Sequence, residues 1–329
     1  MIENFPDELI IEILSHLSAL DIVKGAQYVC QRWHILCKSP AVWKGKEQKI
    51  DGKHNTRDVV EIAKVIPHIT SLCIGKSDNS DNFQAWFTGS HLYISSSIER
   101  DELKCIVDHL NIKNVSAPRS VISRCRSILF TDNVKLESLT VYMGNRPPPD
   151  KDDTFEPLVK QGSLARLRAL HFFGARALSA DTISLLCQSC TDLEELCLHQ
   201  SNKVTSEALY NLKNCSKLKI LQITDTAALK DLSFLKYCPG VTELDISQCY
   251  SLRPAAFQHL LHLKNLKRFH MRHSNVNGLP LSAMRESMKQ LKIIDLYYSY
   301  GYSEREVVQL KRFAPHITVL EGTFNFDRH

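Results

Sequence analysis

The second half of the sequence repeats one apolar spacing, and this repeat constrains the fold more than any other feature. An apolar residue is followed three positions later by a second and two positions after that by a third, first at Leu167, Leu170 and Phe172. The spacing begins again at 193, 218, 241, 266, 291 and 317, in steps of 26, 25, 23, 25, 25 and 26 residues, with Gly322 in the third place of the last unit. The closing alternation favours a short strand with apolar side chains on one face. A fixed period of this length predicts a solenoid of stacked strand units.

A second set of positions recurs behind each predicted strand. They are small residues, most of which can form hydrogen bonds: Ala175, Ser201, Thr226, Cys249, Ser274 and Ser299. We expect them to be buried and to bond to the backbone of the next repeat. A helical stretch should follow in each unit, as at 179–190 and 206–212, with Pro254 and Ser303 as helix starts.

Upstream, the repeat is looser. Strand cores are expected at 69–74, 92–94, 110–112 and 136–141. The chain would then hold about nine to eleven repeats, with the number between residues 75 and 135 left open. Residues 144–154 contain three prolines and clustered charges. They predict an exposed loop, which is either a neutral insertion or a contact for a partner.

Composition excludes several classes of function. The net charge of +5 is spread along the chain without a run of basic residues, which argues against a nucleic-acid partner. No stretch of 18 apolar residues is present, so we expect no membrane span. The eleven cysteines stand mostly in apolar context, which favours free thiols packed in a core in a reducing compartment. Cys187 and Cys190 form a lone CxxC, and we interpret both as packing residues.

Nothing in the sequence indicates an enzyme. The nucleotide-binding, metalloprotease and serine-hydrolase motifs are all absent from it. The 14 histidines are scattered, and none stands at a catalytic or metal-binding spacing from a Cys or Asp. We therefore expect no catalytic residue, no metal and no cofactor.

Residues 5–44 predict a small helical module. Pro6 suits the first position of a helix, and apolar residues follow on one stripe at Leu9, Ile13, Leu14 and Leu17. A second helix should start near Ser18 and run to about Val29, and a third should span 30–38 with Trp33 inward. Three such short helices cannot form a large core, so apolar surface should remain for another protein or for the solenoid.

The same residues resemble the F-box. The matching positions are Phe5–Pro6, Glu8, Ile13–Leu14, Leu17, Asp21–Ile22, Val29–Cys30, Trp33 and Trp43. Phe5 and Ile22 stand where the family has Leu, and both keep the apolar character. The repeats resemble the cysteine-containing class of leucine-rich repeats through Cys190, Cys215, Cys238 and Cys249.

The whole chain is therefore similar to F-box and leucine-rich-repeat proteins. The fold implied is an α/β solenoid, a leucine-rich-repeat horseshoe preceded by a small all-α three-helix F-box. The expected boundaries are an F-box at 1–46, linker helices at 47–68 and the repeat domain at 69–329.

The resemblance implies a substrate receptor of an SCF ubiquitin ligase. In such ligases the F-box docks on a small Skp-type adaptor, the adaptor binds a cullin, and the cullin carries a RING subunit. The repeats hold a protein target for ubiquitination and proteasomal degradation, in the cytoplasm, the nucleus or both. A leucine-rich-repeat scaffold or inhibitor acting outside ubiquitin transfer is the alternative. The target, its degron and any need for a small-molecule co-ligand stay open.

Two sets of site residues follow from the resemblance and the strand alternation. Adaptor contact is expected at Phe5, Pro6, Leu9, Ile13, Leu14, Leu17 and Ile22, some of which must instead support the F-box's own core. Target contact is expected on the concave face, at His171, Phe173, Glu195, His199, Gln222, Thr224, Glu243, Asp245, Arg268, His270, Arg272, Asp295, Tyr297, Glu321 and Thr323.

Two features of this face allow more than one reading. The basic trio at 268, 270 and 272 lies between acidic neighbours. It suits either a bipolar or phosphorylated target segment or an internally paired surface. Tyr297, Tyr298, Tyr300 and Tyr302 are either interface anchors or part of a terminal cap, which residues 324–326 would complete.

Overall fold

The computed structural model describes residues 5–44, 46–50, 56–66, 69–75, 85–88, 91–95, 98–131, 134–144 and 154–322. The chain forms two compact units, Met1–Ser138 and Leu139–His329. The sequence-based predictions for Thr323 and for 324–326, and most of the loop predicted at 144–154, lie outside the described residues.

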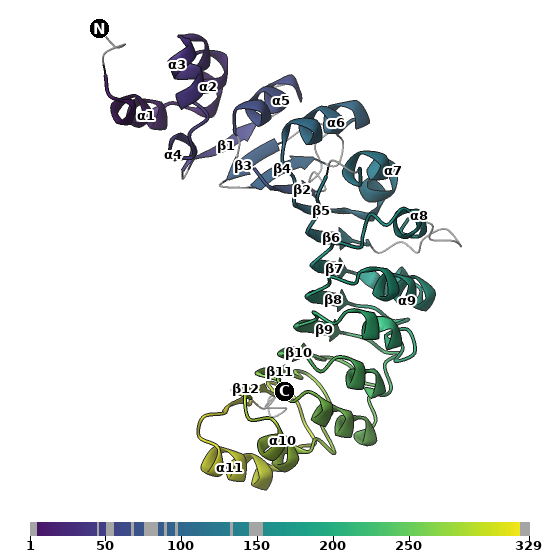
Figure 1. Ribbon diagram of the computed structural model, residues 1–329. Coiled ribbons are helices and arrows are strands. Elements are labelled where there is room, and N and C mark those ends of the chain that lie inside the picture. The colour runs from purple at the N-terminus through teal and green to yellow at the C-terminus, as the bar shows by residue number, and fades with distance from the viewer. Residues whose placement is uncertain are drawn as a thin grey trace, which may run out of the picture. The chain divides into compact units, whose positions relative to one another are not determined.

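The first unit opens with helices, as predicted, but there are four rather than three (Figure 1). They are α1 (Asp7–His16), α2 (Ala19–Lys24), α3 (Gln31–Leu36) and α4 (Pro40–Trp43), with a 3₁₀ turn η2 (Ala26–Tyr28) after α2. The Ser18 side chain caps α2 by accepting from the Asp21 amide at 3.1 Å. Gly25 ends α2 before the predicted limit at Val29, and Pro40 starts the additional helix.

A mixed sheet follows in the same unit. Its order is β1 (Glu47–Ile50), β3 (Ala85–Thr88), β4 (His91–Ser95), β2 (Ser71–Gly75) and β5 (Asn114–Pro118). The pairs β2–β4 and β2–β5 are parallel, whereas β1 and β4 both pair with β3 in antiparallel fashion. The N-terminal edge therefore departs from the all-parallel solenoid that the repeats predicted.

The helices of this unit are α5 (Thr56–Val65), α6 (Arg100–His109) and α7 (Arg119–Leu129). Strands β2 and β4 confirm the cores predicted at 69–74 and 92–94. The strand predicted at 110–112 is wrong, because α6 runs to His109 and the strand β5 starts only at Asn114. The predicted linker 47–68 contains strand β1 and helix α5 rather than helices alone.

The second unit is a solenoid. Its strands are β6 (Ser138–Tyr142), β7 (Ala169–Phe173), β8 (Glu195–His199), β9 (Ile220–Thr224), β10 (Glu243–Asp245), β11 (Arg268–His270), β12 (Ile293–Asp295) and β13 (Thr318–Leu320), in that order in the sheet. Neighbours from β7 to β13 pair in parallel. Every residue of the predicted apolar triplets from 167 to 296 is at most 2% exposed. Stacking of these side chains makes the continuous core.

The last repeat departs from the predicted register. Val319 pairs with Ile294, and Leu320 pairs with Asp295. Leu320 is consequently 42% exposed, although the apolar spacing placed it inside. The final step of 26 residues is one longer than the 25-residue offset of the strand pairing, so the pattern is out of phase there.

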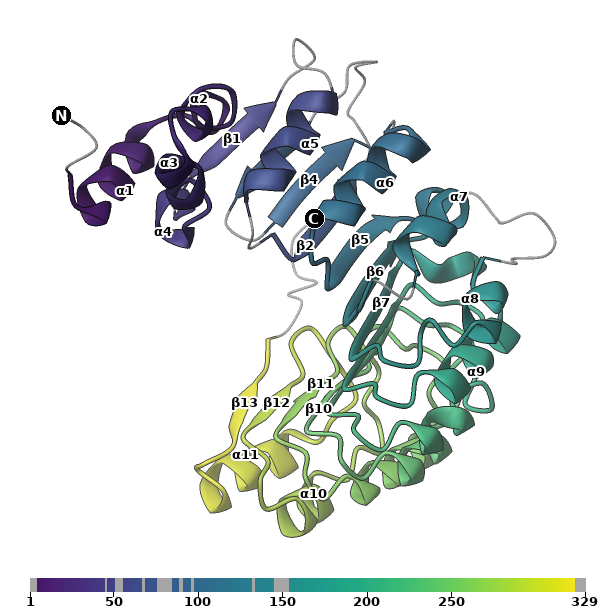
Figure 2. The same ribbon diagram turned by 45° about the horizontal axis from the view of Figure 1, so that its top comes forward.

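The helical segments cover the outer side of this solenoid, and the strands line its inner side (Figure 2). They are α8 (Glu156–Lys160), η3 (Ala175–Ala177), α9 (Ala180–Ser189), η4 (Tyr210–Asn214), η5 (Ser233–Tyr237), η6 (Pro254–His262), α10 (Leu281–Ser287) and α11 (Glu304–Phe313). Pro254 and Ser303 do begin helices, as predicted. The middle segments η4 to η6 are 3₁₀ rather than α-helical.

A residue with left-handed backbone follows each strand from β6 to β12, within three residues of its end. These residues are Gly144, Gly174, Gln200, Asp225, Gln248, His273 and Tyr298, with φ between 48° and 73°. The predicted column of small residues follows from Ala175 onward and is buried throughout. Ser274 shows its use: the hydroxyl accepts from the Gln248 amide at 3.0 Å and donates to the Arg272 carbonyl at 2.8 Å. Backbone groups that the turn leaves unpaired are thereby satisfied.

Candidate functional site

Helix α1 presents an apolar surface to solvent. Phe5 just before it is 38% exposed, and Leu9 and Ile13 on it are 51% and 38% exposed. Ile10 and Leu14, on the adjoining side of the helix, are fully buried. A helix that is apolar on two sides has one side for its own module and one for another molecule.

The residues predicted to contact the adaptor divide into an exposed group and a buried group. Phe5, Pro6, Leu9 and Ile13 are exposed, and Leu17 is half-buried. Leu14 and Ile22 are fully buried. These two residues belong to the module's own core, as does Trp43, whose indole Nε1 donates to the Cys37 carbonyl at 2.6 Å. Some residues of the predicted set were expected to support the module's own core, and Leu14 and Ile22 are the ones that do so.

Three further exposed apolar residues were missed by the sequence analysis. Tyr28, Val29 and Ile35 are 69%, 60% and 62% exposed. They come from η2, the residue after it and α3. The Arg32 side chain ties α3 to the start of α1, with Nε 2.8 Å from Asp7 Oδ1 and Nη2 2.7 Å from the Phe5 carbonyl. The available signal was the helical spacing, because the inward residues Trp33 and Leu36 stand three apart on one side of α3 and Ile35 lies off that side.

The solenoid's sheet presents the other candidate surface. Most of the predicted concave-face residues are half-buried on the strands, and Phe173 and Tyr297 are 37% and 44% exposed. Parallel pairing sets them in rows, such as His171, Cys197 and Gln222. Cys197 belongs to this face although the prediction omitted it. Glu321 leaves the predicted alternation because of the register change at β13.

The charged part of this face is internally paired. Arg272 Nε donates to Asp295 Oδ2 at 2.6 Å, and His270 Nδ1 lies 3.3 Å from the same oxygen. Arg268 pairs with Glu243. Asp295 is fully buried and therefore cannot contact a target directly, contrary to its prediction as a surface residue. Both arginines are held by neighbours, so the structure favours the paired surface over a free phosphate site.

The bonds to Asp295 keep it charged. Burial works to raise the pKa of this carboxyl, but hydrogen bonds from Arg272, the Tyr297 amide and His270 outweigh burial and lower it. The pKa of Arg272 rises in turn, first through its bond to Asp295.

A pocket of about 580 Å³ opens beside this pair. It is lined by Arg272, Asp295, Tyr297, Lys311, Val319, Leu320 and Glu321, of which Lys311 and Glu321 form an ion pair. Tyr300 is 62% exposed, whereas Tyr298 and Tyr302 are half-buried. The tyrosine cluster thus contributes both to packing and to exposed surface.

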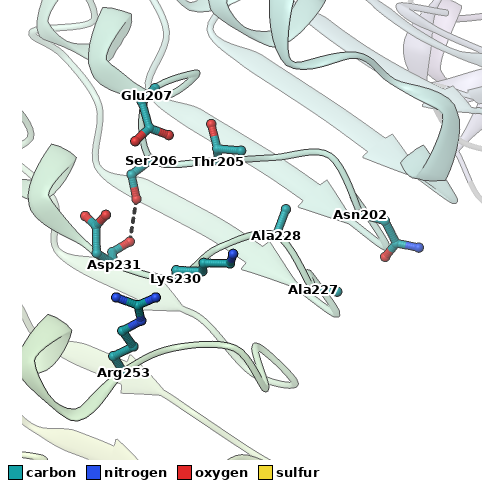
Figure 3. A pocket seen from close by; sticks show the side chains of 9 residues that line it. All are labelled: Asn202, Thr205, Ser206, Glu207, Ala227, Ala228, Lys230, Asp231 and Arg253. Carbon is teal, nitrogen blue, oxygen red and sulfur yellow. Dashed lines mark hydrogen bonds between the residues drawn. The ribbon is translucent and has the colours of Figure 1, made fainter.

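A second pocket, of about 640 Å³, lies on the turns after β8, β9 and β10 (Figure 3). The Ser206 hydroxyl donates to the Asp231 carbonyl at 2.6 Å, which joins two successive turns. Burial opposes ionisation of Asp231, but hydrogen bonds from Ser233 lower its pKa overall. The lining of this pocket carries two basic residues, Lys230 and Arg253, and two acidic residues, Glu207 and Asp231. No feature of the sequence analysis predicted this pocket.

The cysteines form packing columns. All eleven are free thiols, and Cys187, Cys190, Cys215 and Cys238 are buried. Burial raises the pKa of Cys190 and Cys238 to about 12. The Cys215 thiol donates to the carbonyls of Cys187 and Cys190, both at 3.3 Å. The residues that the structure describes contain no His, Cys, Asp or Glu group suited to a metal ion.

Taken together, these surfaces define a class: a helical module with exposed apolar residues, followed by a repeat solenoid with a polar and aromatic inner face. Within the described part of the chain, no helix is long and apolar enough to cross a bilayer.

Comparison with known proteins narrows this class. The F-box-like family model matches residues 2–47. F-box protein SKIP19 of Arabidopsis thaliana is 24% identical over 76% of this chain and 70% of its own length. F-box/LRR-repeat protein 21 of the same plant is 36% identical over 22% of each chain. The chain therefore contains an F-box-like region.

A solved structure of the yeast Rad7 and Elc1 complex also aligns with it. The match covers 95% of this chain and 92% of the other, at 13% identity and a TM-score of 0.42. A likeness of this size transfers no property to the chain. The solenoid assignment rests instead on the strand pairing and the buried repeat core.

Proposed function

We propose that the chain is the substrate-recognition subunit of an SCF-type ubiquitin ligase. The observation that carries this proposal is the exposed apolar stripe of Phe5, Leu9 and Ile13 inside the F-box-like region. An apolar helix face of this kind suits docking into the groove of a partner, here a Skp-type adaptor. The adaptor would connect the chain to a cullin and its RING subunit.

The solenoid would hold the target protein. Its inner face offers exposed aromatic and polar side chains on a rigid sheet, a common basis for protein recognition. The chain would supply no bond chemistry itself. Its contribution is to raise the effective concentration of a target lysine beside the activated ubiquitin. Eleven free thiols fit a reducing compartment, so we place this activity in the cytoplasm or nucleus.

Affinity purification from cells tests the proposal. The native chain should recover adaptor, cullin and RING subunit, and Leu9→Glu with Ile13→Glu should lose all three. Val308→Glu is the matched control, because Val308 is a 63% exposed apolar residue on α11 in the other unit. Targets should be enriched on the adaptor-defective chain, since they bind it without being degraded.

The same purification distinguishes the proposed receptor from the alternative, a scaffold or inhibitor acting outside ubiquitin transfer. A scaffold or inhibitor would keep a tight target complex while recovering no adaptor, whichever variant is used. Recovery of adaptor by both the native and the Leu9→Glu, Ile13→Glu chains would also contradict the proposed docking surface.

A further inference from the structure

A row of aromatic rings crosses the inner face of the solenoid at the ends of β6, β7 and β8. The rings of Tyr142 and Phe173 stack with centroids 5.6 Å apart and an interplanar angle of 23°. The His199 ring follows 6.2 Å from Phe173. Tyr142 and Phe173 are 48% and 37% exposed. Exposed, stacked aromatics on rigid strands are typical anchors for a partner's apolar side chains.

The neighbouring part of the face is acidic. The solvent-facing positions of β7–β10, whose residues are all described, include Glu195, Glu243 and Asp245 but no Lys or Arg. Glu243 is neutralised by Arg268. Glu195 lies 3.2 Å from the ring of His171. Asp245 also acts on Arg272, but that guanidinium is bound by Asp295. Two carboxylates, those of Glu195 and Asp245, are thus left without a Lys or Arg in an ion pair.

These two carboxylates act on the same place. Cys197, with 6% exposure, lies two residues after Glu195 on β8, and it is in register with Asp245 of β10 through Gln222 of β9. Burial raises the pKa of its thiol to about 11, and the charges of Glu195 and Asp245 add to the rise. The local field is therefore negative, and it complements a basic group.

Strand geometry determines how far Glu195 lies from the aromatic ring of His199 on the same strand. Glu195 and His199 are the first and last residues of β8. Four residues of a strand span roughly 13 Å, so Glu195 and His199 are about that far apart along β8. An extended peptide covers the same distance in about four residues.

We propose that the surface formed by Tyr142, Phe173, His199, Glu195 and Asp245 binds an extended segment of the target. The segment presents an aromatic or large aliphatic side chain to the rings and an Arg or Lys, about four residues away, to the carboxylates. Arg suits the site best, since its guanidinium pairs with carboxylates and packs on rings. This inference rests on the proposed function and names the class of target segment for it. An acidic or phosphorylated segment is disfavoured, because Arg268 and Arg272 are already paired.

Selection from a random-peptide phage library on the full-length chain in complex with its adaptor tests the inference. Selected peptides should combine Arg or Lys with an aromatic residue at about the four-residue spacing. By fluorescence anisotropy, their affinity should fall about tenfold for Glu195→Gln with Asp245→Asn and for Phe173→Ala. Asp192→Asn, which removes an acidic residue paired with Lys217 away from this face, should bind as the native chain does. Thermal melts confirm that each variant is folded.

Three results would overturn the inference: no enrichment, selected peptides whose affinity ignores these substitutions, or tighter binding of a synthetic phosphoserine peptide than of the selected ones. Adaptor binding is measured on the same preparations. If the native chain does not bind the adaptor, the proposed function is contradicted. The peptide selection can then be made on the chain without adaptor, and it still tests the proposed peptide-binding surface.

Discussion

Arg272 and Asp295 join two neighbouring repeats: the guanidinium Nε, two residues beyond β11, donates to the carboxylate at the end of β12 across 2.6 Å. The carboxylate is fully buried, and it also accepts from the Tyr297 amide at 3.1 Å. A buried acid with this many donors is a structural element of the sheet.

Replacing Asp295 with Ala should therefore destabilise the solenoid. The change leaves a cation and a backbone amide without their acceptor, and we expect a loss of about 3 kcal/mol in the free energy of unfolding. Urea denaturation measures it. Asp192→Ala removes an exposed ion pair with Lys217 and should change stability by less than about 1 kcal/mol. Equal effects of the two substitutions would contradict the role given to Asp295.

The same carboxyl should make stability depend on acid pH. Its pKa is lowered in the folded chain from the ordinary 3.8, so its charged form stabilises the fold above that value. This contribution should begin to disappear as the pH falls towards 3.8 and be lost once the pH is below the folded pKa. Comparing denaturation of the native chain and Asp295→Asn from neutral to acid pH isolates it: the difference in stability should shrink with acidification. A difference that grows would have the wrong sign.

The left-handed turn residues predict a pair of opposite effects. Gly174 has φ 69°, and a Cβ there would meet nothing closer than 3.9 Å, so Gly174→Ala introduces backbone strain without a clash. We expect it to cost about 1 kcal/mol. Gln248, with φ 60°, already carries that strain, so Gln248→Gly should not destabilise and should gain up to about 1 kcal/mol. Thermal melts of both variants test this. Stabilisation by Gly174→Ala is incompatible with the turn geometry.

Thiol reactivity should divide the cysteines. Cys105 is exposed on α6, whereas Cys190, Cys238 and Cys249 are buried with their pKa raised to about 12. Because the thiolate is the reactive form, iodoacetamide should label Cys105 in the native chain and the buried three only after denaturation. Mass spectrometry of the labelled peptides reads the result. Rapid native labelling of Cys190 would mean that the repeat core opens readily.

The solenoid could be predicted because its signal is repeated. Each apolar triplet, such as Leu193, Leu196 and Leu198, has counterparts about 25 residues away, and parallel stacking requires that agreement. Among the repeated triplets the prediction was wrong at Leu320, because the strand pairing there keeps its 25-residue offset whereas the apolar spacing has shifted by one residue. The antiparallel strand β3 had no such counterpart and was missed.

The F-box surface was harder to predict, for a local reason. Apolar residues occupy positions 9, 10, 11, 13 and 14, so α1 has no single apolar side. Only packing against the helices after it, where Trp43 is buried, determines that Leu14 faces inward and Leu9 outward. Ion pairing was equally hidden: the partner of Arg272 lies 23 residues away, on the next repeat.

Calorimetric titration of the purified Skp-type adaptor into the full-length chain tests the central claim most directly. The native chain and Val308→Glu should bind with equal affinity, and Leu9→Glu with Ile13→Glu should weaken binding by about a hundredfold or more while the melting temperature stays near native. No binding by the native chain, or undiminished binding by the double variant, would contradict the account.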